Sequence, residues 1–235
     1  MKDTLGAQLT STNRSRNFIW LLASRLVFAV EFRDGCSPQI PRITRIGARW
    51  KYTYDWSRDG RQLLVSQAAE GREPLEIWSL PTSEQVEPQA RRIAGDPALN
   101  LYQPHFSADQ RWIVFEALKE RERQSVLFVI PANGGAWIPI TASPHWDDKP
   151  RWSPDGSILY FLSEAHGFFN VWGLHFDGNH GRPIGKPFQV SKFETPDLMI
   201  PTYMPPVELS VAANRMVLNL TEAAGAIWIL DDVGP

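Results

Sequence analysis

A short phrase returns four times along this chain. Each copy joins an aromatic or apolar residue and a Ser to a turn and then to a strongly apolar run. The copies lie at residues 55–65, 105–115, 151–161 and, in a degenerate form, 209–218. A fixed period of roughly 40 to 50 residues with aromatic and Asp-Gly punctuation is typical of radial repeats, in which each unit is one blade. The repeat therefore predicts an all-β fold, a β-propeller of four-stranded antiparallel blades.

The residue types in the turn of each copy suit the backbone conformation that a tight turn requires. Pro154 fixes φ at the second turn position, Asp155 accepts from nearby backbone N–H groups, and Gly156 tolerates the left-handed conformation. Gln110 stands where a Gly is expected, so we predict that the second turn is more strained or differently shaped. The turn residues shared by the copies are interpreted as structural: Asp59, Gly60, Asp109, Asp155 and Gly156.

A further apolar run follows every turn at a steady offset. Each run favours β-structure and is centred on a large aromatic side chain, namely Trp78, Phe128, Trp172 and Trp228. We interpret these runs as the third strands of the blades and their aromatic side chains as core between neighbouring blades.

The repeats set the expected domain organisation. We expect a flexible N-terminal segment at 1–16 and a propeller domain at 17–235. About four to five blades are predicted, at about 25–50 (partial), 51–100, 101–147, 148–200 and 201–235 (degenerate). The chain is then a fragment with an incomplete ring, a shortened relative of larger propellers, or a ring that closes with fewer blades than usual. The apolar runs 18–23 and 26–30 are predicted to be two adjacent strands rather than a signal peptide, because Arg25 interrupts them.

Composition and motifs narrow the function classes. With a net charge of −2, the chain has no excess of positive charge to bind a phosphate backbone, so direct nucleic-acid binding is not expected. The single cysteine, Cys36, cannot form an intramolecular disulfide. The common hydrolase, zinc-protease and nucleotide-binding motifs are missing, and the five histidines lack metal-ligand spacing. We therefore expect no catalysis, no cofactor, no metal and no membrane insertion.

The W-S-x-D-G phrase, with its apolar strand and the later I-W-x-L run, resembles the TolB-like family of six-bladed, WD-like propellers. Segments 144–156, 168–173 and 227–231 are also similar to the closing blades of large bacterial propeller proteins. The resemblance covers roughly residues 25–235 and implies the fold. In that group the propeller often follows a winged-helix DNA-binding domain or a Ser/Thr kinase domain. Six-bladed relatives need more chain than this.

Candidate binding residues follow from propeller geometry. The first strand of each blade lines the central channel, and the residues that lead into it surround one mouth. This places a binding site at Tyr52, Tyr54, Asp55, Tyr102, Gln103, His105, Asp147, Asp148, Lys149 and Arg151, together with Tyr203 and Met204 of the degenerate unit. In the alternative interpretation, Asp147 or Asp148 pairs with Lys149 or Arg151 and only orients the strand.

These observations predict a non-catalytic propeller scaffold that mediates protein–protein interaction or ligand sensing, with a protein or peptide partner at the channel mouth. Two alternatives stay open: the sensory C-terminal propeller of a bacterial winged-helix regulator or Ser/Thr kinase, and the gating propeller of a prolyl-oligopeptidase-like serine hydrolase. The expected location is the cytoplasm if the chain is complete, and the periplasm if it belongs to an exported or membrane-anchored parent.

Overall fold

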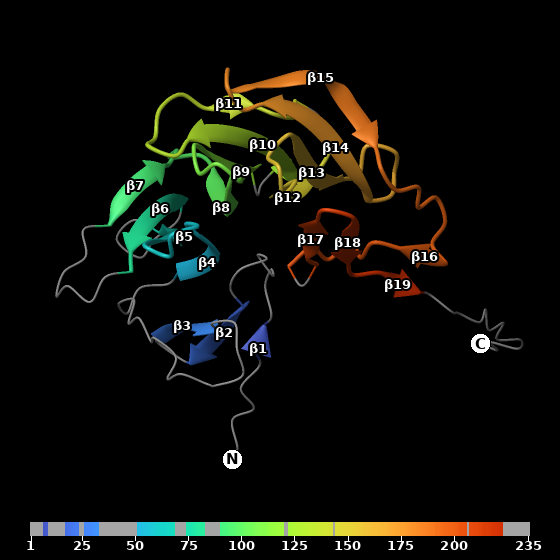
Figure 1. Ribbon diagram of the computed structural model, residues 1–235. Helices are drawn as coiled ribbons and strands as arrows, with labels where there is room; N and C mark the ends of the chain where they lie inside the picture. The colour runs from blue at the N-terminus through green and yellow to red at the C-terminus, as the bar shows by residue number, and fades with distance from the viewer. Residues whose placement is uncertain are drawn as a thin grey trace, which may run out of the picture.

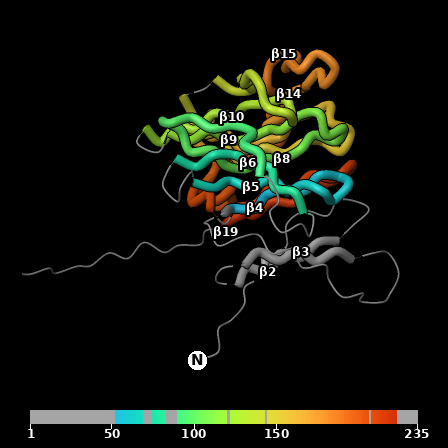
Figure 2. Tube along the Cα trace, turned by 90° about the vertical axis from the view of Figure 1, so that its left-hand side faces the viewer, coloured from blue at the N-terminus to red at the C-terminus, as the bar shows by residue number. Residues whose placement is uncertain are grey.

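The computed structural model describes residues 7–8, 17–23, 26–32, 51–68, 74–82, 90–119, 122–142, 144–205 and 207–222. Their regular structure is almost entirely β. Three four-stranded antiparallel sheets follow one another around an arc (Figure 1), and in each of them the strands pair in chain order. We refer to these sheets as blades 1, 2 and 3. The turned view in Figure 2 shows the same succession from blade 1 in cyan to blade 3 in orange.

Each of the three blades contains one copy of the repeated phrase. Blade 1 contains β4 (Lys51–Trp56), β5 (Gln62–Ala68), β6 (Leu75–Pro81) and β7 (Arg91–Ala94). Blade 2 contains β8 (Asn100–Phe106), β9 (Trp112–Lys119), β10 (Gln124–Pro131) and β11 (Ile138–Pro139). Blade 3 contains β12 (Asp147–Trp152), β13 (Ile158–Ser163), β14 (Asn170–Asp177) and β15 (Arg182–Gln189).

Smaller sheets flank the three blades. The fourth unit contains one pair formed by β17 (Leu209–Ala212) and β18 (Arg215–Leu218), and a second pair formed by β16 (Leu198–Met199) and β19 (Thr221–Glu222). Near the N-terminus, β1 (Ala7–Gln8), β2 (Asn17–Ala23) and β3 (Leu26–Phe32) form a three-stranded sheet. The all-β propeller class is confirmed, and the described part of the chain fits about four blades.

The N-terminal apolar runs form the predicted strands, whereas the degenerate repeat differs from the three blades in its turn. The two apolar runs are adjacent antiparallel strands as predicted, and β1 lies inside the segment expected to be flexible. In the degenerate copy, only Ala213 and Asn214 separate the two strands, whereas residues 57–61 separate β4 and β5. This copy therefore does not repeat the blade turn. Among the described residues, no helix is long and apolar enough to cross a membrane.

The hydrophobic core of the described residues consists of three layers between sheets and a further cluster within blade 1 that contains Leu63 and Trp78. One layer joins blades 1 and 2 around Ile77 and Phe115, a second joins blades 2 and 3 around Leu127 and Leu174, and a third joins blade 3 to the fourth unit. Third-strand aromatics enter these layers as predicted: Phe128 packs in the first layer and Trp172 in the second. Trp228 lies outside the described residues.

The three blade turns share one hydrogen-bond pattern. In blade 3, the Ser153 hydroxyl and the backbone N–H of Ser157 both donate to Asp155 Oδ1. The bond from the Ser153 hydroxyl has the largest effect and the bond from the Ser157 backbone the next largest, and together they lower the pKa of Asp155 to about 2. Asp59 and Asp109 accept equivalent bonds in blades 1 and 2. The turn aspartates are therefore held by the backbone of their own turns.

Gln110 adopts the conformation that suits a glycine. Its φ is 63°, close to the 70° of Gly60 and the 75° of Gly156. The second turn is therefore strained rather than differently shaped. The Gln110 side chain offsets this strain through hydrogen bonds, and its Oε1 accepts the backbone N–H of Arg58 in the neighbouring blade turn at 2.9 Å.

Candidate functional site

A β-bulge interrupts the first strand of all three blades at the same place. The pairing register shifts between Thr53 and Asp55 in β4, between Tyr102 and His105 in β8, and between Asp148 and Arg151 in β12. A bulge bends its strand and re-aims the side chains around it. These strands are the innermost of their blades, so the bulges change the direction of side chains near the propeller axis.

The backbone at two of these bulges is strained. Gln103 and Lys149 have φ values of 54° and 52°, in the left-handed region that non-glycine residues rarely occupy. Each directly precedes a proline, and a residue in that position is normally confined to extended conformations. Such strain persists only where the surrounding structure imposes it, and it is concentrated at ligand-binding and catalytic sites.

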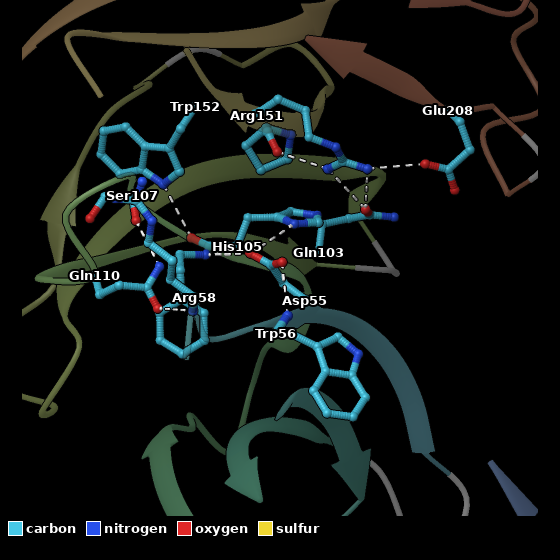
Figure 3. A network of polar contacts seen from close by, with 12 residues as sticks. Asp55, Trp56, Arg58, Gln103, His105, Ser107, Gln110, Arg151, Trp152 and Glu208 are labelled. Carbon is cyan, nitrogen blue, oxygen red and sulfur yellow. Dashed lines mark hydrogen bonds and ion pairs between the residues drawn. The ribbon is translucent and has the colours of Figure 1, made fainter. Parts of the chain in front are cut away.

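Asp55 connects blade 1 to blade 2 at this level (Figure 3). Its Oδ1 accepts the backbone N–H of Trp56 at 2.8 Å, and its Oδ2 accepts the backbone N–H of Phe106 at 2.9 Å. The His105 Nδ1 lies 3.7 Å from the same Oδ2, too far for a hydrogen bond. One carboxylate therefore fixes the relative position of two first strands.

Arg151 continues the network to the fourth unit. Its Nη2 lies 3.0 Å from Glu208 Oε2, and its Nη1 donates to the Pro150 carbonyl at 2.8 Å. Both terminal nitrogens also reach Gln103 Oε1, at 3.4 and 3.5 Å. Figure 3 shows the guanidinium between Gln103 and Glu208, so Arg151 joins blade 2, blade 3 and the fourth unit.

The surroundings of His105 disfavour the protonated form of its imidazole. Burial lowers the pKa of His105, and the nearby Arg151 guanidinium lowers it further. The indole of Trp152 donates to the His105 carbonyl at 3.1 Å, while the buried Nε2 of the imidazole has no hydrogen-bond partner among the described residues. A buried polar atom without a partner is unfavourable, so this Nε2 lowers the stability of the network.

A second, more deeply buried cluster contains Glu116, Asp148 and Lys149. The side chains of Asp148 and Lys149 are each 4% exposed, and Lys149 Nζ lies 4.0 Å from Asp148 Oδ1. Burial raises the pKa of Glu116 well above its usual value, and the charge of Asp148 raises it further. The Ser125 hydroxyl bonds to Glu116 Oε1 at 2.9 Å and to the Asp147 carbonyl, so the cluster is tied to the backbone of blade 3.

Tyr54 extends this cluster to blade 1. Burial raises the pKa of the Tyr54 phenol well above its usual value, and the carboxylate of Glu116 acts in the same direction. Asp147 lies apart from these groups: it is almost fully buried, burial raises its pKa, and neither of its carboxylate oxygens has a hydrogen bond of good geometry. The hydroxyls of Ser163 and Thr141 only partly oppose that rise.

The structure brings most of the predicted binding residues together. Tyr54, Gln103, His105, Asp148, Lys149 and Arg151 contribute to the two clusters described above, which we call the central polar network together with Asp55, Glu116 and Glu208. Tyr52 and Tyr102 lie edge to face with ring centroids 6.1 Å apart, and Tyr52 is half-exposed.

The remaining predicted residues and pairings lie as follows. Met204 is buried in the hydrophobic layer between blade 3 and the fourth unit. Tyr203 is 71% exposed and has no part in the network. Arg151 pairs with Glu208 rather than with Asp147 or Asp148, whereas the contact of Asp148 with Lys149 is present as the alternative interpretation requires.

Sequence reasoning missed Glu116 and Glu208. Glu116 lies within the apolar run Trp112–Leu118 of a predicted second strand, and a charged residue in such a run is a detectable signal of a buried polar site. Glu208 precedes the degenerate repeat in an irregular segment, where no pattern indicates its position. Within the described ranges, no three His, Cys, Asp or Glu side chains are placed to hold a metal ion.

The blades and the polar network at their inner strands define a β-propeller with a strained, polar centre. Comparison with solved structures shows which propellers it resembles: the chain has a TolB-like propeller fold. A putative TolB from Agrobacterium tumefaciens matches with a TM-score of 0.60 and 16% identity, over 88% of this chain and 76% of that one. TolB from Acinetobacter baumannii matches with a TM-score of 0.55 and 14% identity, over 87% of this chain and 49% of that one.

Propeller-containing peptidases give similar scores. A puromycin-hydrolysing peptidase from Mycobacterium tuberculosis matches with a TM-score of 0.55 and 13% identity, over 84% of this chain but only 32% of that one. No protein-family model matches the sequence, and the comparison with curated proteins finds no match. At these identities the similarity shows the fold alone.

Proposed function

We propose that this chain is a non-catalytic propeller scaffold that binds a protein or peptide partner, or a polar ligand, at the central polar network. The observation that supports this most strongly is the repeated strain: Gln103 and Lys149 hold left-handed backbone before proline at equivalent positions of neighbouring blades. Residues that only lead the chain into a strand need no left-handed backbone. A binding site that must present side chains in fixed directions does need such a conformation.

The chemistry of the network fits a polar or peptide ligand. It contains an imidazole with an unpartnered Nε2, a guanidinium, an amide and several carboxyl groups, and the ring pair of Tyr52 and Tyr102 lies on the same first strands. Aromatic and Arg side chains are the usual anchors of recognition. The groups come from blades 1, 2 and 3 and from the fourth unit, so the packing of these sheets against one another positions them.

A gating propeller is the second candidate, because peptidases containing propellers match this chain over most of its length. In that role the propeller would control access to a hydrolase domain in another part of the protein. The two candidate functions differ in the components that they need. The gating role requires a catalytic domain, whereas the scaffold role requires only the propeller and its partner.

A peptide-display experiment tests the scaffold proposal. Random peptides selected on the immobilised chain are titrated into wild type and into the variant Tyr102→Ala/His105→Ala/Arg151→Ala. We expect the affinity to fall by about tenfold or more, since hot-spot residues each contribute about 1.4 kcal/mol or more. The matched control is Tyr203→Ala, which removes an exposed aromatic outside the network.

Gln103→Gly separates binding from folding in the same assay. Glycine accepts the left-handed backbone, so this variant is expected to melt no lower than wild type while its peptide affinity falls, because the amide beside Arg151 is lost. Unchanged affinity in both the triple variant and Gln103→Gly would refute a ligand site at the central polar network.

A further inference from the structure

One carboxylate of the central polar network comes from outside the three blades. Glu208 lies just before β17 in the fourth unit, and its Oε2 accepts from Arg151 Nη2 of blade 3 at 3.0 Å (Figure 3). The side chain of Glu208 is 37% exposed, whereas that of Arg151 is only 13% exposed. The pair therefore joins a covered cation to a carboxylate that reaches the solvent.

Buried groups hold the guanidinium of Arg151 on its other sides. Nη1 donates to the Pro150 carbonyl at 2.8 Å, and both terminal nitrogens reach Gln103 Oε1, at 3.4 and 3.5 Å. Pro150 and Gln103 are both buried. Pro150 follows the strained Lys149, and Gln103 is itself strained, so the two left-handed bulges place acceptors on the same guanidinium. These acceptors orient Arg151 independently of Glu208.

The backbone of Glu208 is anchored, but its side chain is not covered. The neighbouring Val207 and Leu209 are both fully buried in the layer between blade 3 and the fourth unit. The backbone N–H of Glu208 donates to Asn219 Oδ1 at 2.8 Å, just after the end of β18. A partly exposed carboxylate can rotate into water at little cost, because ion pairs near the surface contribute little to stability. Glu208 can therefore leave Arg151 while the fourth unit stays in place.

The contacts of Arg151 decide what a ligand must replace. Each terminal nitrogen of a guanidinium carries two N–H groups, and in the described part of the chain each already has two acceptors. Of these acceptors, only Glu208 is exposed enough to give way. The other cation of the network, Lys149, has a side chain that is 4% exposed and lies beside Asp148. A ligand anchored by Arg151 therefore takes the place of the Glu208 carboxylate.

A carboxylate is the ligand group that this exchange favours. A neutral group would leave the covered guanidinium without its counterion, which is unfavourable. The charges of Asp55 and Asp148 also act on Arg151, so a phosphate dianion would add negative charge beside two carboxylates. A single carboxylate replaces Glu208 with no change in net charge.

We propose that Glu208 is an internal competitor at the ligand site: it occupies Arg151 in the free protein, and a carboxylate of the peptide partner displaces it. This carboxylate is the C-terminus of the peptide or an Asp or Glu side chain. The inference rests on the proposed function and adds to it the chemical class of the ligand and a residue that limits the affinity. Because the peptide binds only molecules in which Glu208 has left Arg151, the observed affinity is lower than the intrinsic affinity by that fraction.

Peptide titrations with a Glu208→Gln variant test the competition. Random peptides with free C-termini are selected separately on the immobilised wild-type chain and on Glu208→Gln. Glutamine keeps the size of the side chain but lacks the charge that pairs with Arg151. We therefore expect the best binder to bind Glu208→Gln about twofold to fivefold more tightly than wild type. Glu208→Ala should behave alike, since it also removes the competing charge. The matched control is Glu194→Gln, which removes an exposed carboxylate paired with Lys192 and should leave the affinity unchanged.

Neutralised peptides identify the carboxylate. The best binder is synthesised as the C-terminal amide and, separately, with Asn or Gln in place of each Asp or Glu. One of these changes is expected to lower the affinity by about tenfold or more, because hydrogen bonds to charged groups are the stronger ones. The peptide that loses affinity shows whether the C-terminus or a side chain binds Arg151, and for that peptide the advantage of Glu208→Gln should disappear.

The outcomes separate this inference from the proposed function. Tighter binding to Glu208→Gln that depends on one peptide carboxylate supports the inference. Equal or weaker binding to Glu208→Gln overturns it, as does a best binder that tolerates the loss of every carboxylate. The proposed function stands in those cases if the peptide still loses affinity in the variant Tyr102→Ala/His105→Ala/Arg151→Ala. If neither wild type nor Glu208→Gln selects any binder, both the inference and the proposed peptide site are refuted.

Discussion

Gln110 shows how one residue can be both strained and useful. Its positive φ costs roughly 1–2 kcal/mol for a side chain with a Cβ. Its amide recovers a similar amount, because Oε1 accepts from Arg58 in the adjacent turn and Nε2 donates to the Ser107 carbonyl at 3.1 Å. Gln110 is therefore strained in its own backbone, and its side chain connects the turns of two neighbouring blades.

Substitutions at this position can separate the two effects. Gln110→Ala keeps the strain and loses both hydrogen bonds, so it should destabilise the fold by about 1–2 kcal/mol. Gln110→Gly loses the same bonds but relieves the strain, so it should stay within about 1 kcal/mol of wild type. Urea denaturation of both variants measures the difference, and equal destabilisation by Ala and Gly would show that the strain is negligible.

At the scale of elements, the β14–β15 hairpin of blade 3 is anchored on blade 2. The Trp112 indole donates to the Gly178 carbonyl at 2.9 Å, and Arg111 donates to Asn179 Oδ1 at 3.2 Å. A Cβ at Gly181 would meet the Trp112 ring at about 2.1 Å, far inside van der Waals contact. The hairpin therefore needs a glycine for two reasons, its φ of 62° and the ring beside it.

Gly181→Ala should therefore destabilise the protein by about 1–3 kcal/mol, through overpacking together with backbone strain. Trp112→Leu removes the overlapping ring, so the additional cost of Gly181→Ala should be smaller in that background. Chemical denaturation of the four proteins of this cycle gives the coupling. If the cost were the same in both backgrounds, the ring contact would not limit this hairpin.

The sequence predicted elements better than it predicted side-chain partners. The turn phrase around Asp155 and the aromatic Trp172 place two strands of blade 3, because turn chemistry and strand alternation are local properties. The bulges at Gln103 and Lys149 could not be predicted, since a residue before proline normally favours extended backbone. The ion pair of Arg151 with Glu208 depends on ring geometry, and no local pattern indicates it.

For the whole molecule, the buried Glu116 connects blade packing to pH. Its pKa is raised above the usual 4.5, so at pH values between the unfolded-state and folded-state pKa the folded state holds a proton that the unfolded state releases. The stability that this proton provides is complete below the unfolded pKa and is lost as pH rises through the folded pKa. Glu116→Gln keeps a neutral side chain at all pH values and retains an acceptor for Ser125.

The stability of Glu116→Gln relative to wild type should accordingly improve as pH rises from acid to neutral. Denaturation midpoints measured across a pH series test this expectation. Glu194→Gln, which removes an exposed carboxylate, is the matched control. Parallel profiles for wild type and Glu116→Gln would contradict the role assigned to this proton.

Three of the hydrophobic clusters in the described part of this molecule are layers, each shared by two neighbouring sheets, while a fourth, around Leu63 and Trp78, belongs to blade 1. A substitution within one such layer changes the packing of the two blades that share it, while the packing within the other blades is preserved. The natural unit of variation is therefore a whole blade rather than a strand or a loop. Duplication or loss of one repeat creates or removes a single interface, so related chains can differ in length by whole repeats while each remaining blade keeps its local structure.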